Sequence, residues 1–230
     1  MPGQKASEAI RCEQILTAAY EVASRKGIDG LTVRAVAAKA KLSHGLVLFH
    51  FKRKDQLVNA LLDRVLATTL KLHVPEDIAR IPHALDRLRA LLRQEMDRLS
   101  HEPRGIRLFF EYWARGTHHN ATRVKISAAL DSYRAVFRTT TEDILRTEPA
   151  RFTGATSDGL AAVAVSLISG CAVQAMIDPD HFDINQYLAA VQGVIGGRSS
   201  PAALRNACAA GAALLGAVHV TGARRGREPS

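Results

Sequence analysis

The chain has 230 residues, of which 47% are hydrophobic, and it carries a formal net charge of +9 at pH 7. This length and hydrophobic content allow a sizeable buried core and exclude a fully disordered protein. The positive charge favours a polyanionic partner or a membrane surface, and by itself does not decide between them.

The placement of the charge is more informative than its total. Residues 1–60 contain ten Lys and Arg against five Asp and Glu, a local excess of +5. A basic segment of this kind at one end of the chain favours a nucleic acid as the partner, because Lys and Arg neutralise backbone phosphates.

The first predicted elements are three helices with turn and cap residues between them. Apolar side chains recur at helical spacing over residues 12–26, and Gly27 is suited to end that helix. A short helix follows Thr32, whose hydroxyl can accept a hydrogen bond from the first turn, and Ser43 repeats this device before a helix at residues 44–50. Two capped helices with about three residues between them form a helix-turn-helix, whose second helix can enter a DNA major groove.

Candidate DNA contacts divide into base-facing and phosphate-facing residues. On the exposed side of the second helix, Gly45 permits close approach and Phe49 can contact a thymine methyl group. The base-facing candidates are Ser43, His44, Gly45 and Phe49. Charged and polar side chains around the motif are better placed for backbone phosphates. The phosphate-facing candidates are Thr32, Arg34, Lys41, His50, Lys52 and Lys54.

A set of residues at specific spacing recurs between residues 12 and 62. It comprises IL-AA at Ile15–Ala19, Lys26–Gly27, Thr32, the A-x-x-x-LS run ending at Ser43, Gly45, His50–Phe51, Lys54 and Leu57. With these residues the segment resembles the N-terminal domain of the TetR family of bacterial transcriptional regulators. The resemblance implies that Lys54 binds a phosphate together with N–H groups at the start of the helix that follows.

Three positions depart from the family pattern. Lys41 stands where the family usually has the turn glycine, so a side chain must tolerate a positive φ or the turn must adjust. Leu48 replaces the usual tyrosine and removes a hydroxyl that commonly reaches a phosphate. Arg53 replaces a small polar cap residue. We expect these changes to alter single contacts and to leave the fold intact.

The rest of the chain is also predicted to be helical. The predicted helices span residues 55–72, 83–100, 104–115, 121–147, 158–177 and 184–195, and residues 201–220 form a possible further helix before a flexible tail. We therefore expect an all-α fold with a three-helix helix-turn-helix DNA-binding domain and a C-terminal helical ligand-binding and dimerisation domain. The expected limits are residues 1–54 for DNA binding, 55–197 for effector binding and dimerisation, and 198–230 for the extra helix and tail.

Two motifs in the C-terminal part carry a second, less specific resemblance. FFEYWARG at Phe109–Gly116 and LISGCAVQAMIDPD at Leu167–Asp180 are similar to the ligand-sensing domain of the BetI-like branch of the TetR family. The resemblance implies a homodimer in which the last two helices of each copy form a four-helix bundle. The helix at residues 158–177 is apolar almost all round, and such a helix must be covered on every side. The expected interface residues are Val165, Ile168, Gly170, Ala172 and Ala175.

The same resemblance places a small-molecule effector near the aromatic cluster. Four of the chain's twelve aromatic residues lie between residues 109 and 113. The expected effector-binding residues are Phe109, Tyr112, Trp113, Tyr133 and Gln174. The π faces of Tyr112 and Trp113 would suit a quaternary ammonium ion. The alternative is that the cluster is ordinary core, because consecutive aromatic residues on a helix cannot all face one way.

Other chemistries are not indicated. Cys12, Cys171 and Cys208 are widely spaced and are expected to be reduced thiols. The adjacent His118 and His119 point apart on a helix and have no further ligands at suitable spacing, so we expect no metal and no cofactor. No nucleophile elbow or phosphate loop is present, so an enzyme or carrier is disfavoured.

The expected location and function follow. The polar N-terminus lacks the apolar segment of a signal peptide, and the run Ala207–Val218 is too short to span a bilayer. We therefore expect a cytoplasmic protein with no membrane partner. The favoured function is a dimeric transcriptional repressor that leaves a palindromic operator on the double-stranded DNA when an effector binds. The alternative is a sequence-independent architectural DNA-binding protein, which would need no ligand.

Overall fold

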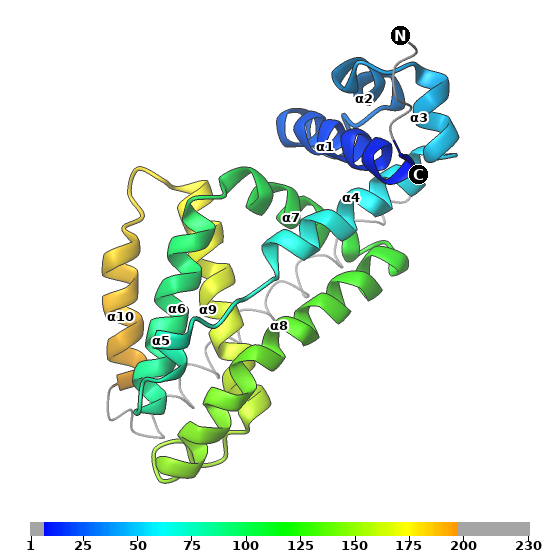
Figure 1. Cartoon of the computed structure of the whole chain (residues 1–230). Coiled ribbons are helices and arrows are strands. Elements are labelled where there is room, and N and C mark those ends of the chain that lie inside the picture. Colours follow the sequence, from blue (N-terminus) through cyan, green and yellow to red (C-terminus); the bar gives the residue numbers. More distant parts are fainter. Residues whose placement is uncertain (1–6, 197–230) are drawn as a thin grey trace, which may run out of the picture. The chain divides into compact units, whose positions relative to one another are not determined.

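The computed structural model describes residues 7–196, and every regular element within this range is a helix (Figure 1). The helices are α1 (Glu8–Lys26), α2 (Val33–Ala40), α3 (His44–His50), α4 (Lys54–Thr69), α5 (Glu76–Ala79), α6 (Ala84–Ser100), α7 (Pro103–Gly116), α8 (Asn120–Thr147), α9 (Ser157–Ile177) and α10 (Ile184–Gly196). The all-α prediction is confirmed for these residues. The predicted helix at residues 201–220 and Cys208 lie outside them.

The start of α1 lies four residues before the predicted start. The side chain of Ser7 caps the helix by accepting a hydrogen bond of 3.4 Å from the Ile10 N–H, and Glu8 adds negative charge in the first turn. At the other end, Gly27 has φ 72° and its N–H donates to the Ala23 carbonyl at 2.8 Å. Gly27 therefore ends α1 as predicted.

The helix α4 connects the N-terminal helices to the rest of the fold. Its apolar stripe is buried, including Leu57, Leu61 and Val65, and it packs against α1, α7 and α8. It ends at Thr69, three residues before the predicted end, and the short helix α5 follows between Pro75 and Pro82. Contacts join the described residues up to Leu188 into one compact unit. The expected domain limits remain predictions.

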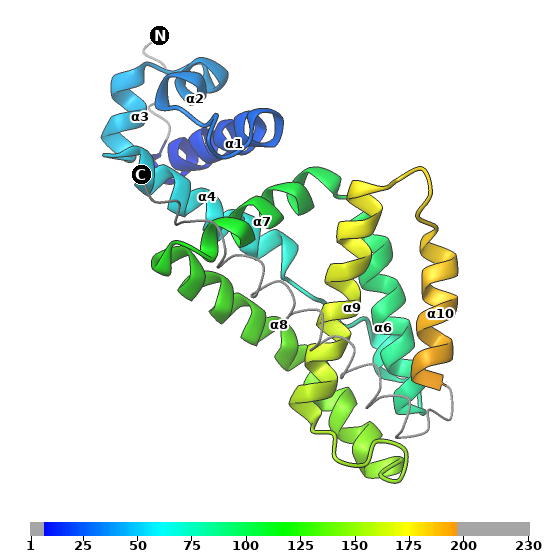
Figure 2. The same cartoon turned by 180° about the vertical axis from the view of Figure 1, so that it is seen from behind.

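The C-terminal helices pack around a second apolar core. Figures 1 and 2 show α9 beside α6 from both sides, with α8 crossing them, and α9 packs closely against both. Leu91, Leu92, Met96, Phe137 and Ile144 are almost completely buried there. The Tyr187 hydroxyl of α10 donates to the Leu167 carbonyl of α9 at 2.9 Å, which attaches the start of the last helix to α9.

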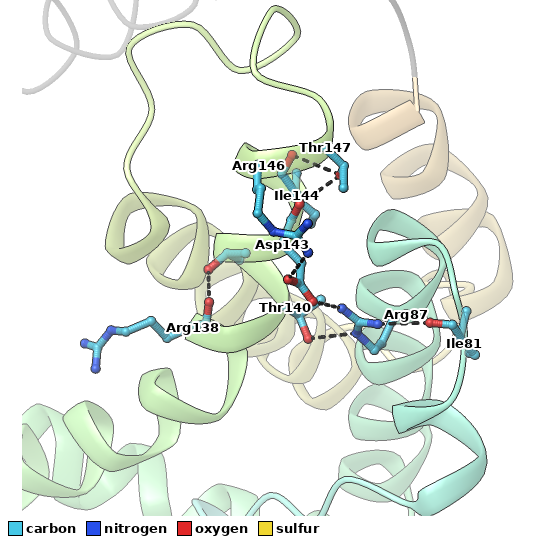
Figure 3. Close-up of polar contacts among 9 residues, drawn as sticks. Ile81, Arg87, Arg138, Thr140, Asp143, Ile144, Arg146 and Thr147 are labelled. Atoms are coloured by element: carbon cyan, nitrogen blue, oxygen red, sulfur yellow. Dashed lines mark hydrogen bonds and ion pairs between the residues drawn. The ribbon is translucent and has the colours of Figure 1, made fainter.

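A polar network joins the first turn of α6 to the end of α8 (Figure 3). Arg87 forms an ion pair with Asp143, donates from Nη1 to the Ile81 carbonyl at 2.9 Å and from Nε to the Thr140 hydroxyl at 3.4 Å. Asp143 also accepts from Arg146 at 2.8 Å. This hydrogen bond, together with the charge of Arg87, holds the pKa of Asp143 below its ordinary value.

We expect Arg87→Ala to lower the free energy of unfolding at pH 7 by about 2 kcal/mol, because three groups lose their hydrogen bonds to a largely buried guanidinium. The melting temperature should fall by roughly 4–8 °C. A lowered carboxyl pKa stabilises the fold at pH values above the unfolded-state pKa. This stabilisation is lost as the pH falls through the folded-state pKa. Thermal melts should therefore show the largest difference from wild type near neutral pH and a smaller one in acid. An equal difference at both pH values would contradict the role given to Asp143.

Candidate nucleic-acid interface and ligand cavity

The turn between α2 and α3 is built around Lys41. This residue has φ 55° and ψ 42°, and within residues 7–196 it is the single non-glycine residue with a positive φ. The Leu42 N–H donates to the Ala37 carbonyl at 2.9 Å and the Lys41 N–H to the Ala38 carbonyl at 3.2 Å, so the end of α2 is fully capped. Of the two alternatives left open by the sequence, Lys41 therefore takes the positive φ.

We expect Lys41→Gly to raise the free energy of unfolding by up to about 1 kcal/mol, since glycine adopts this conformation without a steric penalty. Chemical denaturation measures this change. A loss of stability in the glycine variant would show that contacts of the lysine side chain outweigh the backbone strain.

The helix caps of the helix-turn-helix lie at the residues predicted from the sequence. The Thr32 hydroxyl accepts from the Ala35 N–H at 3.1 Å, and the Ser43 hydroxyl accepts from the Leu46 N–H at 3.1 Å. Arg53 precedes α4 without a side-chain cap hydrogen bond. Thr32 and Ser43 are thus confirmed as caps, and their hydroxyls are already engaged in the fold.

The helix α3 has one buried side and one exposed side. Val47 is completely buried and Phe51 nearly so, and both belong to the apolar core formed with α1, α2 and α4. His44 and Gly45 are exposed, Phe49 is 74% exposed, and no atom lies within 4 Å of a Cβ placed on Gly45. An exposed phenylalanine next to an open glycine on a short helix is a surface suited to a groove.

Cations flank this exposed side. Arg34, Lys52, Arg53 and Lys54 are exposed, and none of them pairs with a carboxylate in the described part of the chain. Lys39 differs, because it forms an ion pair with Glu21. Free cations on one side of a helix-turn-helix are suited to backbone phosphates.

His50 is less free than predicted. It is half-buried, and its Nδ1 lies 3.6 Å from the Cys12 Sγ at the start of α1. The ring is therefore held against α1 on one side, which leaves the other ring nitrogen for a phosphate. Sequence reasoning missed this contact because the two residues are 38 positions apart.

A cavity of about 240 Å³ lies between α6, α7, α9 and the segment before α10. It is lined by Met96, Leu99, Ser100, Pro103, Ile106, Ile168, Cys171, Ala172, Ala175, Met176, Pro179, Phe182 and Ile184. None of the five predicted effector-binding residues lines it. Three residues predicted for the dimer interface, Ile168, Ala172 and Ala175, do.

The predicted effector residues of α7 are part of the core around the N-terminal helices. Phe109 and Tyr112 are buried with the side chains of α1 and α4, and Trp113 packs against that cluster. The Tyr112 hydroxyl donates to the Val58 carbonyl at 2.7 Å, and burial raises its pKa. These aromatic residues attach α7 to α4, so the core interpretation describes them better than the pocket interpretation.

Tyr133 also has a different position from the predicted one. It is buried, and its hydroxyl donates to Glu95 Oε2 at 2.7 Å. Glu95 is completely buried and accepts from Arg98 Nη2 at 2.8 Å. The same guanidinium donates to the carbonyls of Thr69 at 2.8 Å and Thr68 at 3.1 Å, at the end of α4. This Glu95 network joins α6, α8 and α4; Gln174, the fifth predicted residue, is exposed on α9.

The helix α7 reaches from the cavity to the N-terminal helices. Pro103 and Ile106 in its first turn line the cavity. Glu111, two turns later, accepts a hydrogen bond of 2.8 Å from the Ile28 N–H after α1. A Cβ on Gly27 would lie 3.2 Å from the same carboxylate, so the glycine also makes room for this contact. The helix α7 therefore contacts both the cavity and the segment that follows α1.

The helix α9 has two different faces. Val165 and Ile168 are buried inside the chain, so these two predicted interface residues are not available to a second copy. Val163 and Ile177, which are 52% and 74% exposed, lie on the outward face with the half-buried Gly170. By length and composition α9 is apolar enough to cross a membrane, a test that core helices of soluble proteins also pass. Only 28% of its most apolar window is buried, so much of the helix remains uncovered.

The comparisons with known proteins agree with this architecture. A model of bacterial regulatory proteins of the tetR family matches residues 15–61, and a model of the C-terminal domain of BetI-type transcriptional repressors matches residues 84–198. An uncharacterized HTH-type transcriptional regulator in the dhlA 5' region of Xanthobacter autotrophicus is 34% identical over 180 residues, which cover 75% of this chain and 83% of that protein. The chain belongs to the TetR family.

Solved structures of this fold include transcriptional regulators with bound ligands. A transcriptional regulator from Saccharomonospora viridis in complex with choline has a TM-score of 0.67 and 17% identity, over 82% of this chain and 97% of that one. FadR from Bacillus subtilis in complex with stearoyl-CoA has a TM-score of 0.64 and 16% identity, over 82% and 99% of the two chains. As a TetR family member this chain is a DNA-binding transcriptional regulator and not an enzyme.

Proposed function

We propose that this TetR family member is a cytoplasmic, homodimeric repressor that leaves a palindromic operator when a small molecule occupies the cavity. The observation that carries the proposal is the exposed side of α3, where the open Gly45 and the exposed Phe49 share a helix-turn-helix with unpaired cations. Each copy would place α3 in a major groove, with the two half-sites one helical turn or more apart. The partners are double-stranded operator DNA, a second copy of the chain and the effector.

The proposed DNA contacts keep the division made from the sequence. His44, Gly45 and Phe49 face the bases, with Ser43 at the edge of the same surface. The proposed phosphate contacts are Thr32, Arg34, Lys41, His50, Lys52 and Lys54. Lys54 opens α4, so its ammonium and the free N–H groups of the first turn can bind one phosphate together.

The dimer is proposed to form on the outward face of α9. Val163, Ser166, Gly170, Gln174 and Ile177 follow one another at helical spacing and carry no charge. An uncharged and largely apolar helix face of this length is unfavourable in water and is covered when a second copy packs on it. Of the five interface residues predicted from the sequence, Gly170 is the one that remains on this face.

We expect Val163→Arg to make the protein monomeric, because a guanidinium buried in an apolar interface loses its hydration without gaining a partner. Sedimentation velocity measures the change. Val124→Arg is the matched control, since Val124 is 58% exposed on α8, away from this face, and the variant should stay dimeric. A dimeric Val163→Arg protein would remove the proposed interface.

Release from DNA is proposed to work by a shift between two conformations. The ligand must bind the conformation that does not fit DNA more tightly than the one that does. The physical connections are the first turn of α7, which lines the cavity, and Glu111, which holds the segment after α1. A second connection runs from Met96 and Leu99 in the cavity wall to Arg98, which holds the end of α4.

The deciding experiment is selection of bound fragments from the source genome with the full-length protein, followed by titration of the best duplex at several salt concentrations. A palindromic site bound far more tightly than unrelated DNA supports the proposed function. Equal, strongly salt-dependent binding to every fragment would indicate an architectural DNA-binding protein instead.

A further inference from the structure

We propose that the cavity selects an uncharged, mainly apolar molecule of about eight non-hydrogen atoms. This inference rests on the proposed function in one respect, namely that the cavity is the effector site. It specifies the chemical class of the effector from the wall, the polar groups and the size of the cavity.

The wall offers no charge to a ligand. Among the described residues that line the cavity, none has a carboxylate, an ammonium, a guanidinium or an imidazole. Aliphatic and thioether side chains dominate, including Met96, Ile106, Ile168 and Met176. A charged ligand would lose its hydration on entering such a cavity and would gain no partner, whereas an apolar ligand gains from the transfer.

The two polar side chains of the wall, Ser100 and Cys171, do not make the cavity favourable for a charged ligand. The Ser100 hydroxyl donates to the Asp97 carbonyl at 2.7 Å, so its proton is already used within α6. Burial, aided by the charge of Asp97, raises the pKa of the Cys171 thiol to about 11, which keeps the thiol neutral at physiological pH. Asp97 itself is exposed and does not line the cavity.

The cavity also lacks an aromatic box for a cation. Phe182 is the single aromatic residue among the described lining residues, and recognition of a quaternary ammonium ion commonly uses several rings around the cation. The rings that could have formed such a box, Phe109, Tyr112 and Trp113, are packed near the N-terminal helices instead. A cation would therefore find neither a carboxylate nor a cage.

The size of the cavity limits the ligand further. A volume of about 240 Å³ holds about eight groups of the size of a water molecule, each of which occupies about 30 Å³ in the liquid. This is below the usual range of pockets for drug-sized ligands. The cavity therefore fits a short branched alkane derivative or a single substituted ring, and a long acyl chain does not fit inside it.

The test uses two probes of the same shape that differ in charge. Choline and 3,3-dimethylbutan-1-ol have the same heavy-atom skeleton, but the alcohol has carbon in place of the quaternary nitrogen. We expect calorimetric titration of the full-length protein to give a dissociation constant at least tenfold lower for the alcohol, and toluene to bind as well. A dissociation constant for choline equal to or lower than that for the alcohol would overturn the inference. So would the absence of binding of either neutral probe at millimolar concentration.

Two variants locate the binding. Ala172→Phe fills the cavity and should raise the dissociation constant of the alcohol at least tenfold. The matched change Ala135→Phe, on the exposed side of α8, should leave that constant unchanged. Ser100→Asp adds a carboxylate to the wall near the exposed end of α6 and should shift the preference toward choline at least tenfold. Neutral-probe binding that survives Ala172→Phe in a folded protein would place the site elsewhere and overturn the inference.

Measuring operator affinity in the presence of the same probes separates this inference from the proposed function. Neutral probes that bind in the cavity without changing operator affinity would support the cavity chemistry and contradict release by the effector. Choline that releases the operator, with loss of this effect in Ala172→Phe, would support release and contradict the uncharged ligand.

Discussion

Replacing Glu95 with alanine is expected to lower the free energy of unfolding by about 3–4 kcal/mol. The carboxylate is completely buried, and its removal leaves the Tyr133 hydroxyl without its acceptor and the Arg98 guanidinium without its counter-charge. Breaking a buried ion pair on one side is strongly destabilising, and here the buried Tyr133 hydroxyl and the half-buried Arg98 lose the same partner. Thermal denaturation should show a fall in melting temperature of roughly 6–15 °C.

Glu95→Gln serves as the control for this variant, since the amide keeps an acceptor for Tyr133 and removes the charge alone. It should lie between wild type and Glu95→Ala in stability. The Glu95 network also holds the end of α4 through the Thr68 and Thr69 carbonyls, so both variants should bind operator DNA with altered affinity even where the protein is folded. A melting temperature of Glu95→Ala within 2 °C of wild type would contradict the stabilising role of the network.

Removing the positive charges of Lys52 and Lys54 together is expected to weaken operator binding about a hundredfold. A dimer would lose four phosphate contacts, and exposed charge pairs contribute roughly 0.7 kcal/mol each, so the total of about 3 kcal/mol corresponds to this factor. The dependence of log affinity on log salt should become shallower by about 3.6, since each lost phosphate contact removes about 0.9 from the slope. The measurement is titration of Lys52→Ala/Lys54→Ala with one operator duplex between about 50 and 200 mM salt.

Lys39→Ala is the matched control for the lysine pair. Lys39 is exposed on α2 and belongs to the same basic segment, but its ammonium already pairs with Glu21. Its removal should leave the salt slope nearly unchanged. If Lys39→Ala reduced the slope as much as the double variant, the binding would follow total charge and not the placement of Lys52 and Lys54.

Local signals in the sequence predicted the N-terminal helices well. Thr32 and Ser43 cap α2 and α3 as expected, and the backbone at Lys41 takes the positive φ that the family pattern implied. These features depend on residues within one or two turns, which is the range over which cap and turn chemistry acts. The early start of α1 was missed because the polar Ser7 and Glu8 precede the apolar pattern that was used to place the helix.

The environment of the aromatic residues could not be predicted in the same way. The sequence located the cluster at residues 109–113, but which side faces the cavity depends on how α7 packs against α4 and α6. Tyr112 bonds to a carbonyl 54 positions away, and Tyr133 to a carboxylate 38 positions away. Periodicity within one helix carries no information about such partners.

One signal for the Glu95 network was present in the sequence. Glu95 falls at the helical spacing of Leu88, Leu92 and Leu99, on the stripe of α6 that is otherwise apolar. An acidic residue on a buried stripe, with an arginine three positions later, indicates a buried ion pair. The distant partners of that pair, at the end of α4 and on α8, still required the structure.

Because much of the cavity wall comes from α9 and the segment after it, the ligand preference of such a regulator can change separately from its DNA-binding helices. Ala172, Ala175 and Met176 of α9 and Phe182 after it form much of the wall, whereas α4 and α7 are the helices after α3 that pack closely against α1. A change of side-chain volume at these wall positions alters which molecules fit and leaves the operator-reading surface intact. Under the proposed function, gene duplication followed by a few substitutions in α9 is enough to change the effector, and the same positions are the ones to randomise when building a biosensor.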